Sequence, residues 1–292
     1  MFGRRLFIAS SASALLGAQK PEPPVEFICP MDTDVRQQQP GKCPRCGMKL
    51  VAGLPDPIEY TLRATVSPSN PRFGTPVRLR FEIRHPKTGA LVPNFEEIHE
   101  RPFHLFLVHE SLEFFAHEHP AERSPGVFEL DYDFPEGGMW RLLCDFFPTG
   151  GTPQLITKTL LMPGARMRVP ELKSDVAETH KSKNLSATLK LTPPEPLAGD
   201  KTLLQYRITP REGIENYLGA MGHMLVASAD LVDLIHTHPF LIDGGLATPP
   251  DDAKLVQFNV IFPRAGMYRV WAQFQRSGVV NTVPFTVSVG AL

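Results

Sequence analysis

The sequence predicts an all-β protein, in which two tandem β-sandwiches follow a small cysteine-rich knuckle. Thirty prolines and 22 glycines in 292 residues favour short strands and turns over long helices. Apolar and polar positions alternate along most of the chain, and the order of these segments occurs twice. With 42% apolar and 21% charged residues, the chain also has enough apolar side chains for a buried core.

Composition excludes several classes of protein. Thirty Lys and Arg against 31 Asp and Glu give a net charge of −1, which lacks the basic surplus of a nucleic-acid binder. No apolar run reaches the roughly 18–20 residues needed to cross a bilayer. The sequence has no nucleophile elbow, phosphate loop or dinucleotide fingerprint. We therefore expect no nucleic-acid partner and no transmembrane span.

Residues 1–19 are typical of a signal peptide. Arg4 and Arg5 form a basic start, an apolar segment rich in Ser and Ala follows, and polar sequence begins after it. The paired arginines fit either a twin-arginine signal or a general secretory signal. We expect an exported mature protein, either periplasmic or secreted.

Residues 26–53 form the knuckle and hold three of the four cysteines. Cys43 and Cys46 can bind one metal ion, because the turn between them orients both sulfurs toward the same point and Gly47 permits the backbone of a tight turn. Thiolates and thioethers favour Cu(I) or Zn over Mg or Ca. The candidate ligands of the knuckle are Cys29, Met31, Cys43, Cys46 and Met48.

This knuckle resembles the heavy-metal-binding domain of copper-efflux adaptor proteins and copper-pumping ATPases. The shared pattern is Cys-Pro-Met, a spacer, and Pro-Gly-x-Cys-Pro-x-Cys-Gly-Met. It departs from the family at Asp32 and Thr33, where the family has His-Pro, so a harder oxygen replaces a histidine. The resemblance implies bound copper, with zinc as the alternative. A structural zinc staple, or a disulfide of Cys46 with Cys43 or Cys29, would also fit these residues.

The remaining sequence is divided into a first sandwich at 57–163, a polar linker at 164–184 and a second sandwich at 185–292. Each sandwich has about seven strand candidates, which suits an immunoglobulin-like or cupredoxin-like fold. The clearest strands are expected at 60–66, 76–83, 104–108, 127–134, 139–146 and 155–162, then at 186–192, 203–209, 223–227, 256–262, 267–274 and 280–289. Cys144, in an apolar run, is expected to be a buried small residue.

The two sandwiches carry the same histidine pattern. Residues 104–120 align with 223–239 without a gap, and residues 134–146 align with 262–274, which indicates an internal duplication. The repeated histidines are His104, His117 and His119 in the first copy and His223, His236 and His238 in the second.

Strand geometry gives these histidines a candidate role. His117 and His119 are two residues apart and share one side of a strand, and a short turn lets the strand beginning at His104 run beside them. Three converging imidazoles suit copper or zinc and leave an open position. Whether the triads form one site or two stays open, and a hydrogen-bonded structural cluster is the alternative. Further candidate ligands are Asp32, His99, Met139, Met221 and Met267.

The sandwiches also resemble uncharacterised exported proteins that accompany the heavy-metal-binding domain, which implies metal handling without a defined reaction. We expect an exported protein that binds copper or another heavy metal, sequesters or relays it, and meets a metal-efflux or metal-acceptor protein. There are two alternative hypotheses: a metalloenzyme with a three-histidine site, and a structural or adhesion protein. Binding is favoured over catalysis because Glu118, between His117 and His119, should face away from them.

Overall fold

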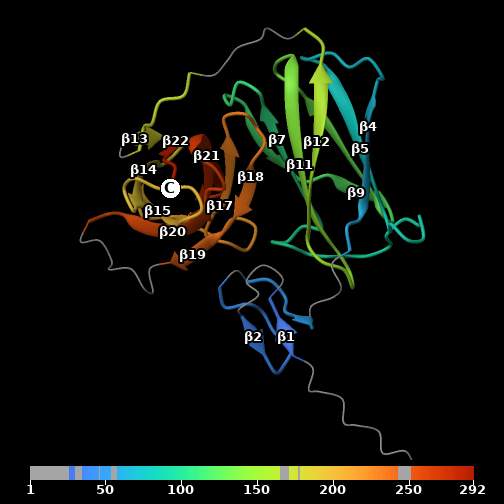
Figure 1. Ribbon diagram of the computed structural model, residues 1–292, viewed down its shortest axis with the longest axis horizontal. Helices are drawn as coiled ribbons and strands as arrows, with labels where there is room; N and C mark the ends of the chain where they lie inside the picture. Colours follow the sequence, from blue (N-terminus) through green and yellow to red (C-terminus); the bar gives the residue numbers. More distant parts are fainter. Residues whose placement is uncertain are drawn as a thin grey trace, which may run out of the picture.

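The computed structural model places the chain in three β-rich parts (Figure 1). It describes residues 26–29, 35–45, 47–53, 58–164, 171–176, 178–242 and 251–292. The predicted signal peptide at 1–19 lies outside these residues, as do Met31, Asp32 and Cys46.

The N-terminal part, here called the knuckle module (residues 26–53), contains a three-stranded sheet in the order β2-β1-β3. Its strands are β1 (Phe27–Ile28), β2 (Arg36–Gln37) and β3 (Val51–Ala52). Cys29, Cys43 and Leu50 form its small buried cluster. Sheets this short bury little surface, so a metal or packing against the sandwiches must contribute to their stability.

The first sandwich has sheets in the orders β4-β5-β10-β9 and β12-β11-β7-β8, with β6 paired to β11. The strands are β4 (Thr61–Ser67), β5 (Pro76–Arg84), β6 (Phe95–Glu96), β7 (Phe103–His109), β8 (Phe115–Glu118), β9 (Ala121–Ser124), β10 (Val127–Asp133), β11 (Gly138–Pro148) and β12 (Gln154–Met162). Cys144 is fully buried in the core of this sandwich.

The second sandwich has sheets in the orders β13-β14-β15-β20-β19 and β16-β21-β17-β18, with β22 paired to β21. The strands are β13 (Thr179–Lys181), β14 (Ser186–Thr192), β15 (Lys201–Thr209), β16 (Ile214–Glu215), β17 (His223–Ser228), β18 (Leu234–Thr237), β19 (Pro239–Ile242), β20 (Lys254–Ile261), β21 (Gly266–Arg276) and β22 (Val279–Val289). The predicted all-β class with two sandwiches is confirmed. Part of the expected linker differs, since β13 lies within it and pairs with β14.

The two sandwiches pack against each other, as Figure 1 shows. Every residue of β7 and of β17 is buried, because one face of each strand joins its own sandwich core and the other meets the neighbouring sandwich. In β7, for example, Leu105 faces the core and Phe106 faces the neighbour. We call the shared apolar contact the interface cluster, formed by Phe106, Val108, Leu112, Leu143, Leu225, Ala227, Leu231 and Trp271.

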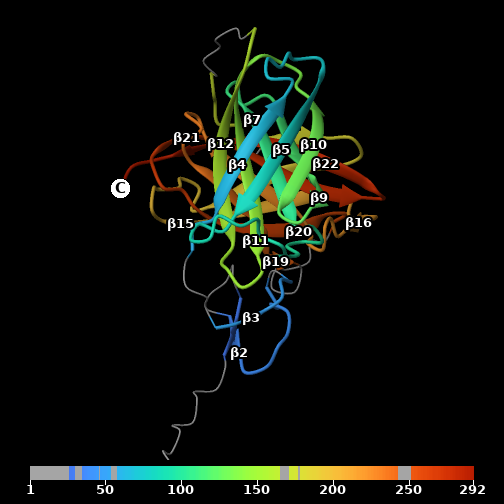
Figure 2. The same cartoon turned by 90° about the vertical axis from the view of Figure 1, so that its right-hand side faces the viewer.

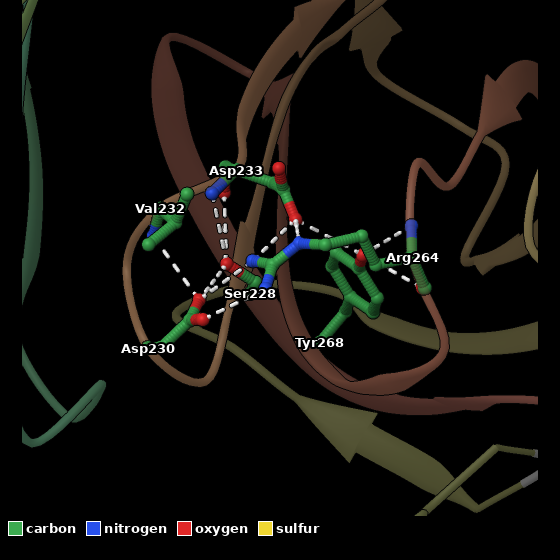
Figure 3. Close-up of polar contacts among 6 residues, drawn as sticks. All are labelled: Ser228, Asp230, Val232, Asp233, Arg264 and Tyr268. Carbon is green, nitrogen blue, oxygen red and sulfur yellow. Dashed lines mark hydrogen bonds and ion pairs between the residues drawn. The ribbon is translucent and has the colours of Figure 1, made fainter.

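A charged network fixes the turn between β17 and β18 (Figure 3). The Arg264 guanidinium donates to both Asp230 and Asp233, at 3.0 Å and 2.8 Å. The Ser228 hydroxyl donates to Asp230 at 2.6 Å, and the Tyr268 hydroxyl contacts Asp233 at 3.3 Å. Because this turn sets the register of β17 against β18, the network holds the histidines of those strands in place.

The corresponding turn of the first sandwich uses a histidine instead of a charged network. His109 Nε2 donates to the Gly137 carbonyl at 3.0 Å, and its Nδ1 contacts the Ser111 hydroxyl at 2.8 Å. Leu112 in this turn and Leu231 in the other have the same left-handed backbone, with φ of 60° and 55°. His109 is thus a structural residue of the duplicated turn.

Trp271→Ala should destabilise the protein, because Trp271 is 2% exposed and its ring stacks on Phe115 of the other sandwich at 5.1 Å. We expect the free energy of unfolding in urea to fall by about 3–5 kcal/mol. Leu161→Ala is the control, since that side chain is 72% exposed. Equal midpoints for the two variants would show that the interface cluster does not contribute to stability.

Candidate metal centre

The first histidine triad is assembled by the pairing of β7 with β8. Phe106 lies opposite His117, and His104 is two residues from Phe106 on the same face of β7. His119 follows directly after β8. The antiparallel pair therefore brings all three imidazoles to the face that meets the second sandwich.

Hydrogen bonds orient the rings of this triad. His104 Nε2 donates to the Ile98 carbonyl at 2.7 Å, because a carbonyl oxygen can only accept, and this leaves the lone pair on Nδ1. His117 Nδ1 donates to Gln273 Oε1 at 2.8 Å, since the Gln273 amide nitrogen itself donates to Thr282, and the lone pair stays on Nε2.

The ligand nitrogens of the first triad face one another closely. His104 Nδ1 is 3.0 Å from His117 Nε2 and 3.1 Å from His119 Nε2. Two nitrogens bound to one tetrahedral ion at about 2.0–2.1 Å stand about 3.3–3.4 Å apart. Facing lone pairs at 3.0 Å repel each other unless a cation or a proton lies between them. The donor set and its spacing thus fit a metal ion.

The second copy forms a different group. His223 Nε2 donates to the Tyr217 carbonyl at 2.9 Å, which leaves Nδ1 to face His238 Nε2 at 3.1 Å. The third member is His99, which comes from the first sandwich. Ligand atoms of His99, His223 and His238 all lie within 4.8 Å of one another.

His236 is held by the opposite sandwich. Its Nδ1 lies 2.7 Å from Asp145 Oδ2, and its Nε2 is buried with no hydrogen-bond partner in the described part of the chain. The arrangement mirrors that of His117 and Gln273, because Asp145 pairs with His104 across β11 and β7, and Gln273 occupies the matching position of β21. Each sandwich therefore orients one histidine of the other. This role of Asp145 and Gln273 is not among the expectations from the sequence, although the two residues share one column of the repeat alignment.

The two groups form one continuous histidine cluster across the interface. The His223 ring centroid lies 5.6 Å from that of His117 and 6.3 Å from that of His104, and the His236 centroid lies 6.1 Å from that of His104. The cluster comprises His99, His104, His117, His119, His223, His236 and His238.

Burial keeps six of the cluster imidazoles neutral, namely those of His99, His104, His117, His119, His223 and His238. It lowers the pKa of His104 to about 4, and that of His99 and His119 to about 3, from an ordinary value of 6.5. Neighbouring imidazoles add to the shift, because a second positive charge would be repelled, while Asp145 opposes it at His104 and His99. Burial also holds the pKa values of His117, His223 and His238 well below 6.5. Neutral imidazole is the form that binds metals.

The structure does not bring the methionine candidates Met139 and Met267 to the histidines. On β11, Met139 comes one residue before Trp140, which pairs with His109. His109 ends β7, so Met139 lies at the opposite end of this strand from His104. Met267 likewise lies six positions before Gln273, the partner of His223, which is about 20 Å along an extended strand. The expectation that they supply a fourth ligand is therefore corrected by the strand register. Met221 lies two residues before His223, outside β17, and is half-buried.

The knuckle module places Cys29 and Cys43 in one buried cluster. The Arg45 amide donates to Cys43 Sγ at 3.4 Å, and the Gly47 amide donates to the Cys43 carbonyl at 2.9 Å. Gly47 has φ of 77°, so this turn requires glycine, as the sequence predicts. Met48 instead lies in a separate apolar cluster at the surface of the first sandwich.

Comparison with known proteins agrees with these parts. Residues 58–160 and 181–291 match a family described as Domain of unknown function (DUF8832). The chain belongs to the DUF8832 family. Residues 27–52 match a second family, described as Heavy metal binding domain, so this DUF8832 chain carries a heavy-metal-binding module before its duplicated sandwich.

One curated relative is a Copper-exporting P-type ATPase of Legionella pneumophila, which is 41% identical over 51 residues. The aligned segment is 18% of the DUF8832 chain and only 6% of the ATPase.

Solved structures resemble the DUF8832 chain only loosely. The Escherichia coli adhesin FdeC aligns over 82% of the chain and 68% of its own length, with 12% identity and a TM-score of 0.26. The fibronectin(III)-like modules of Clostridium thermocellum CbhA align over 78% of the chain and 95% of their own length, with 10% identity and a TM-score of 0.21. The fold assignment thus rests on the strands described above. Within the described residues, no helix is long and apolar enough to span a membrane.

The metal-free protein should lose stability as the pH falls. The folded pKa values of His99, His104 and His119 lie below the unfolded value of 6.5, so their contribution to stability is complete above pH 6.5 and is lost toward pH 3–4. Denaturation from pH 7 to pH 4 should show a loss of about 1.4 kcal/mol per pH unit for each histidine protonated only when unfolded. His119→Gln should flatten this slope, and an unchanged slope would contradict the assigned protonation states.

Proposed function

We propose that the DUF8832 chain is an exported copper-binding protein that holds the ion in the histidine cluster and relays it. The observation that carries this proposal is the set of facing, neutral ring nitrogens, with His104 Nδ1 at 3.0 Å and 3.1 Å from its two partners. Facing lone pairs without a hydrogen-bond partner destabilise a buried site, and a bound cation would offset this destabilisation.

Ligand chemistry supports copper, with zinc as the alternative. Imidazole suits both ions, and the cysteines of the heavy-metal-binding module add the soft thiolates that Cu(I) prefers. The similarity of that module to a copper-exporting ATPase favours copper. The predicted signal peptide supports export, where the physiological partner would be a metal-efflux or metal-acceptor protein.

The geometry favours binding over hydrolysis at this site. Glu118 lies opposite Leu105, a residue of β7 that faces the sandwich core. Consecutive residues of a strand point to opposite faces, so Glu118 and His117 face opposite sides of β8. Asp145 does contact the cluster, but its carboxylate is hydrogen-bonded to His236 at 2.7 Å. Both carboxylates are therefore poorly placed to act as a general base for a metal-bound substrate.

Metal content tests the proposal directly. The mature protein, from about Lys20, should bind copper in separate fractions at the module and at the cluster. A Cys29/Cys43/Cys46→Ser variant should lose the first fraction, and a His117/His119/His236/His238→Ala variant should lose the second. Elemental analysis after loading with Cu(I), Cu(II) or Zn provides the measurement.

His85→Ala is the control for the metal-content experiment, because His85 lies in a turn outside the cluster and should retain all bound metal. If only the cysteine variant loses metal, and that metal is zinc, the histidines are structural and the proposal fails.

Asp145→Asn should weaken metal binding at His236, the cluster histidine that Asp145 contacts. Asn keeps a hydrogen-bond acceptor for His236 Nδ1 but removes the negative charge that makes the imidazole a stronger ligand for a metal ion. Loss of such an outer contact changes metal affinity by about 10–100-fold. Competition with a chelator measures the change. Gln273→Glu is the reciprocal variant, which should strengthen binding at His117. Equal affinities in all three proteins would show that these contacts do not tune the site.

A further inference from the structure

The knuckle module docks on the first sandwich beside the histidine cluster. Met48 is 5% exposed and packs against Ile98 and Phe147, and Lys49 pairs with Glu96 at 3.6 Å. Ile98 is also the residue whose carbonyl accepts from His104. The docking contact and the cluster therefore share one backbone segment.

The module also touches the second sandwich. The Arg45 guanidinium lies 5.0 Å from the centre of the Phe240 ring, a cation–π distance, and Phe240 is two residues after His238. Arg45 is part of the turn that carries Cys43. Figures 1 and 2 place the module at the end of the molecule where both sandwiches meet. The metal-binding turn thus lies against the segment that carries a cluster histidine.

A cavity of about 520 Å³ separates the module from the cluster. Gly47 and Met48 line it from the module, His99 and Glu100 line it from the first sandwich, and Gly219 lines it from the second. The walls also contain the carboxylates of Glu96 and Glu97 and the ammonium groups of Lys42 and Lys49. With Lys49 paired to Glu96, acidic groups outnumber the remaining ammonium, which favours a cation in this space.

His99 connects this cavity to the cluster. It is 8% exposed, its Nε2 has no hydrogen-bond partner among the described residues, and its ring lies 3.7 Å from that of His238 and 5.2 Å from that of His223. Its turn matches the turn at Leu218 in the second copy, because both are closed by a bridge between their flanking residues. Only the first copy has a histidine there, so the duplicated fold alone does not require one.

We propose that the docked module passes its metal ion through this cavity to His99, which transfers it to the site formed with His223 and His238. The inference rests on the proposed function. The transfer is a ligand exchange: bonds from the ion to sulfur break, bonds to imidazole nitrogen form, and the released thiolates take up protons from water. No electron is moved. The site of His99 fills before the first triad, since the triad does not line the cavity.

The experiment follows one equivalent of Cu(I) added to the reduced, full-length mature protein. The thiolate-to-copper charge-transfer absorption should decay, and X-ray absorption should show sulfur neighbours replaced by nitrogen, at a rate independent of protein concentration. His99→Ala should slow this decay by more than about tenfold, the scale on which even outer contacts alter a metal site. His85→Ala, which removes an imidazole outside the cluster and away from the cavity, should keep the wild-type rate. Equal rates in His99→Ala and wild type would overturn the proposal.

A second pair of variants tests docking without changing a ligand. Phe240→Ala removes the ring beneath Arg45 and should slow transfer by about threefold, as expected for loss of one cation–π contact. Lys201→Ala removes the other cation above the same ring, at 5.3 Å, and should leave the rate unchanged. Equal rates in these two variants would show that transfer does not use the docked module.

Direct loading separates this inference from the function on which it rests. A Cys29/Cys43/Cys46→Ser variant loaded with Cu(II) should still give copper with only nitrogen and oxygen neighbours. If it does while His99→Ala transfers at the wild-type rate, the cluster binds metal but the route is wrong. If it binds no copper, the proposed function itself fails.

Discussion

The structure depends on β7 and β17 being buried on both faces. A strand of a single sandwich would present one face to water, but here the outer faces of β7 and β17 form the interface cluster with Phe106, Leu225 and Trp271 among its members. His104 and His223 continue the same faces, so packing the sandwiches together removes them from water. The desolvation that lowers the histidine pKa values is therefore a consequence of apolar packing a few residues away.

Duplication explains the symmetry of the cluster, and later substitution explains its asymmetry. Asp145 and Gln273 occupy matching positions and each bonds a histidine of the opposite sandwich, so the cross-bracing belongs to the repeat itself. One brace carries a negative charge and the other does not. His99 adds a second difference, because it joins the histidines of the second copy from the first sandwich. Two groups of the same ancestry thus offer an ion different surroundings.

Much of the fold could be predicted because its signals are local. Alternation predicts strands, and the short turn before His117 predicts the antiparallel pair that brings it to His104. The contact between sandwiches could not be predicted, since a strand buried on both faces has no alternation to show which face meets a partner. The methionine expectation failed for a different reason. Sharing a sheet with a histidine does not fix position along the strand, and the register places Met139 at the far end from His104.

Metal binding and sandwich packing are linked through His99. A site made by His99 of one sandwich with His223 and His238 of the other exists only while the two are packed together. A bound ion would therefore stabilise the interface by mass action, as any ligand of the packed state does. Without the ion, the interface cluster must offset the repulsion of the facing lone pairs. The knuckle module contacts both sandwiches at that end of the interface, so its docking favours the same packed state that completes the site.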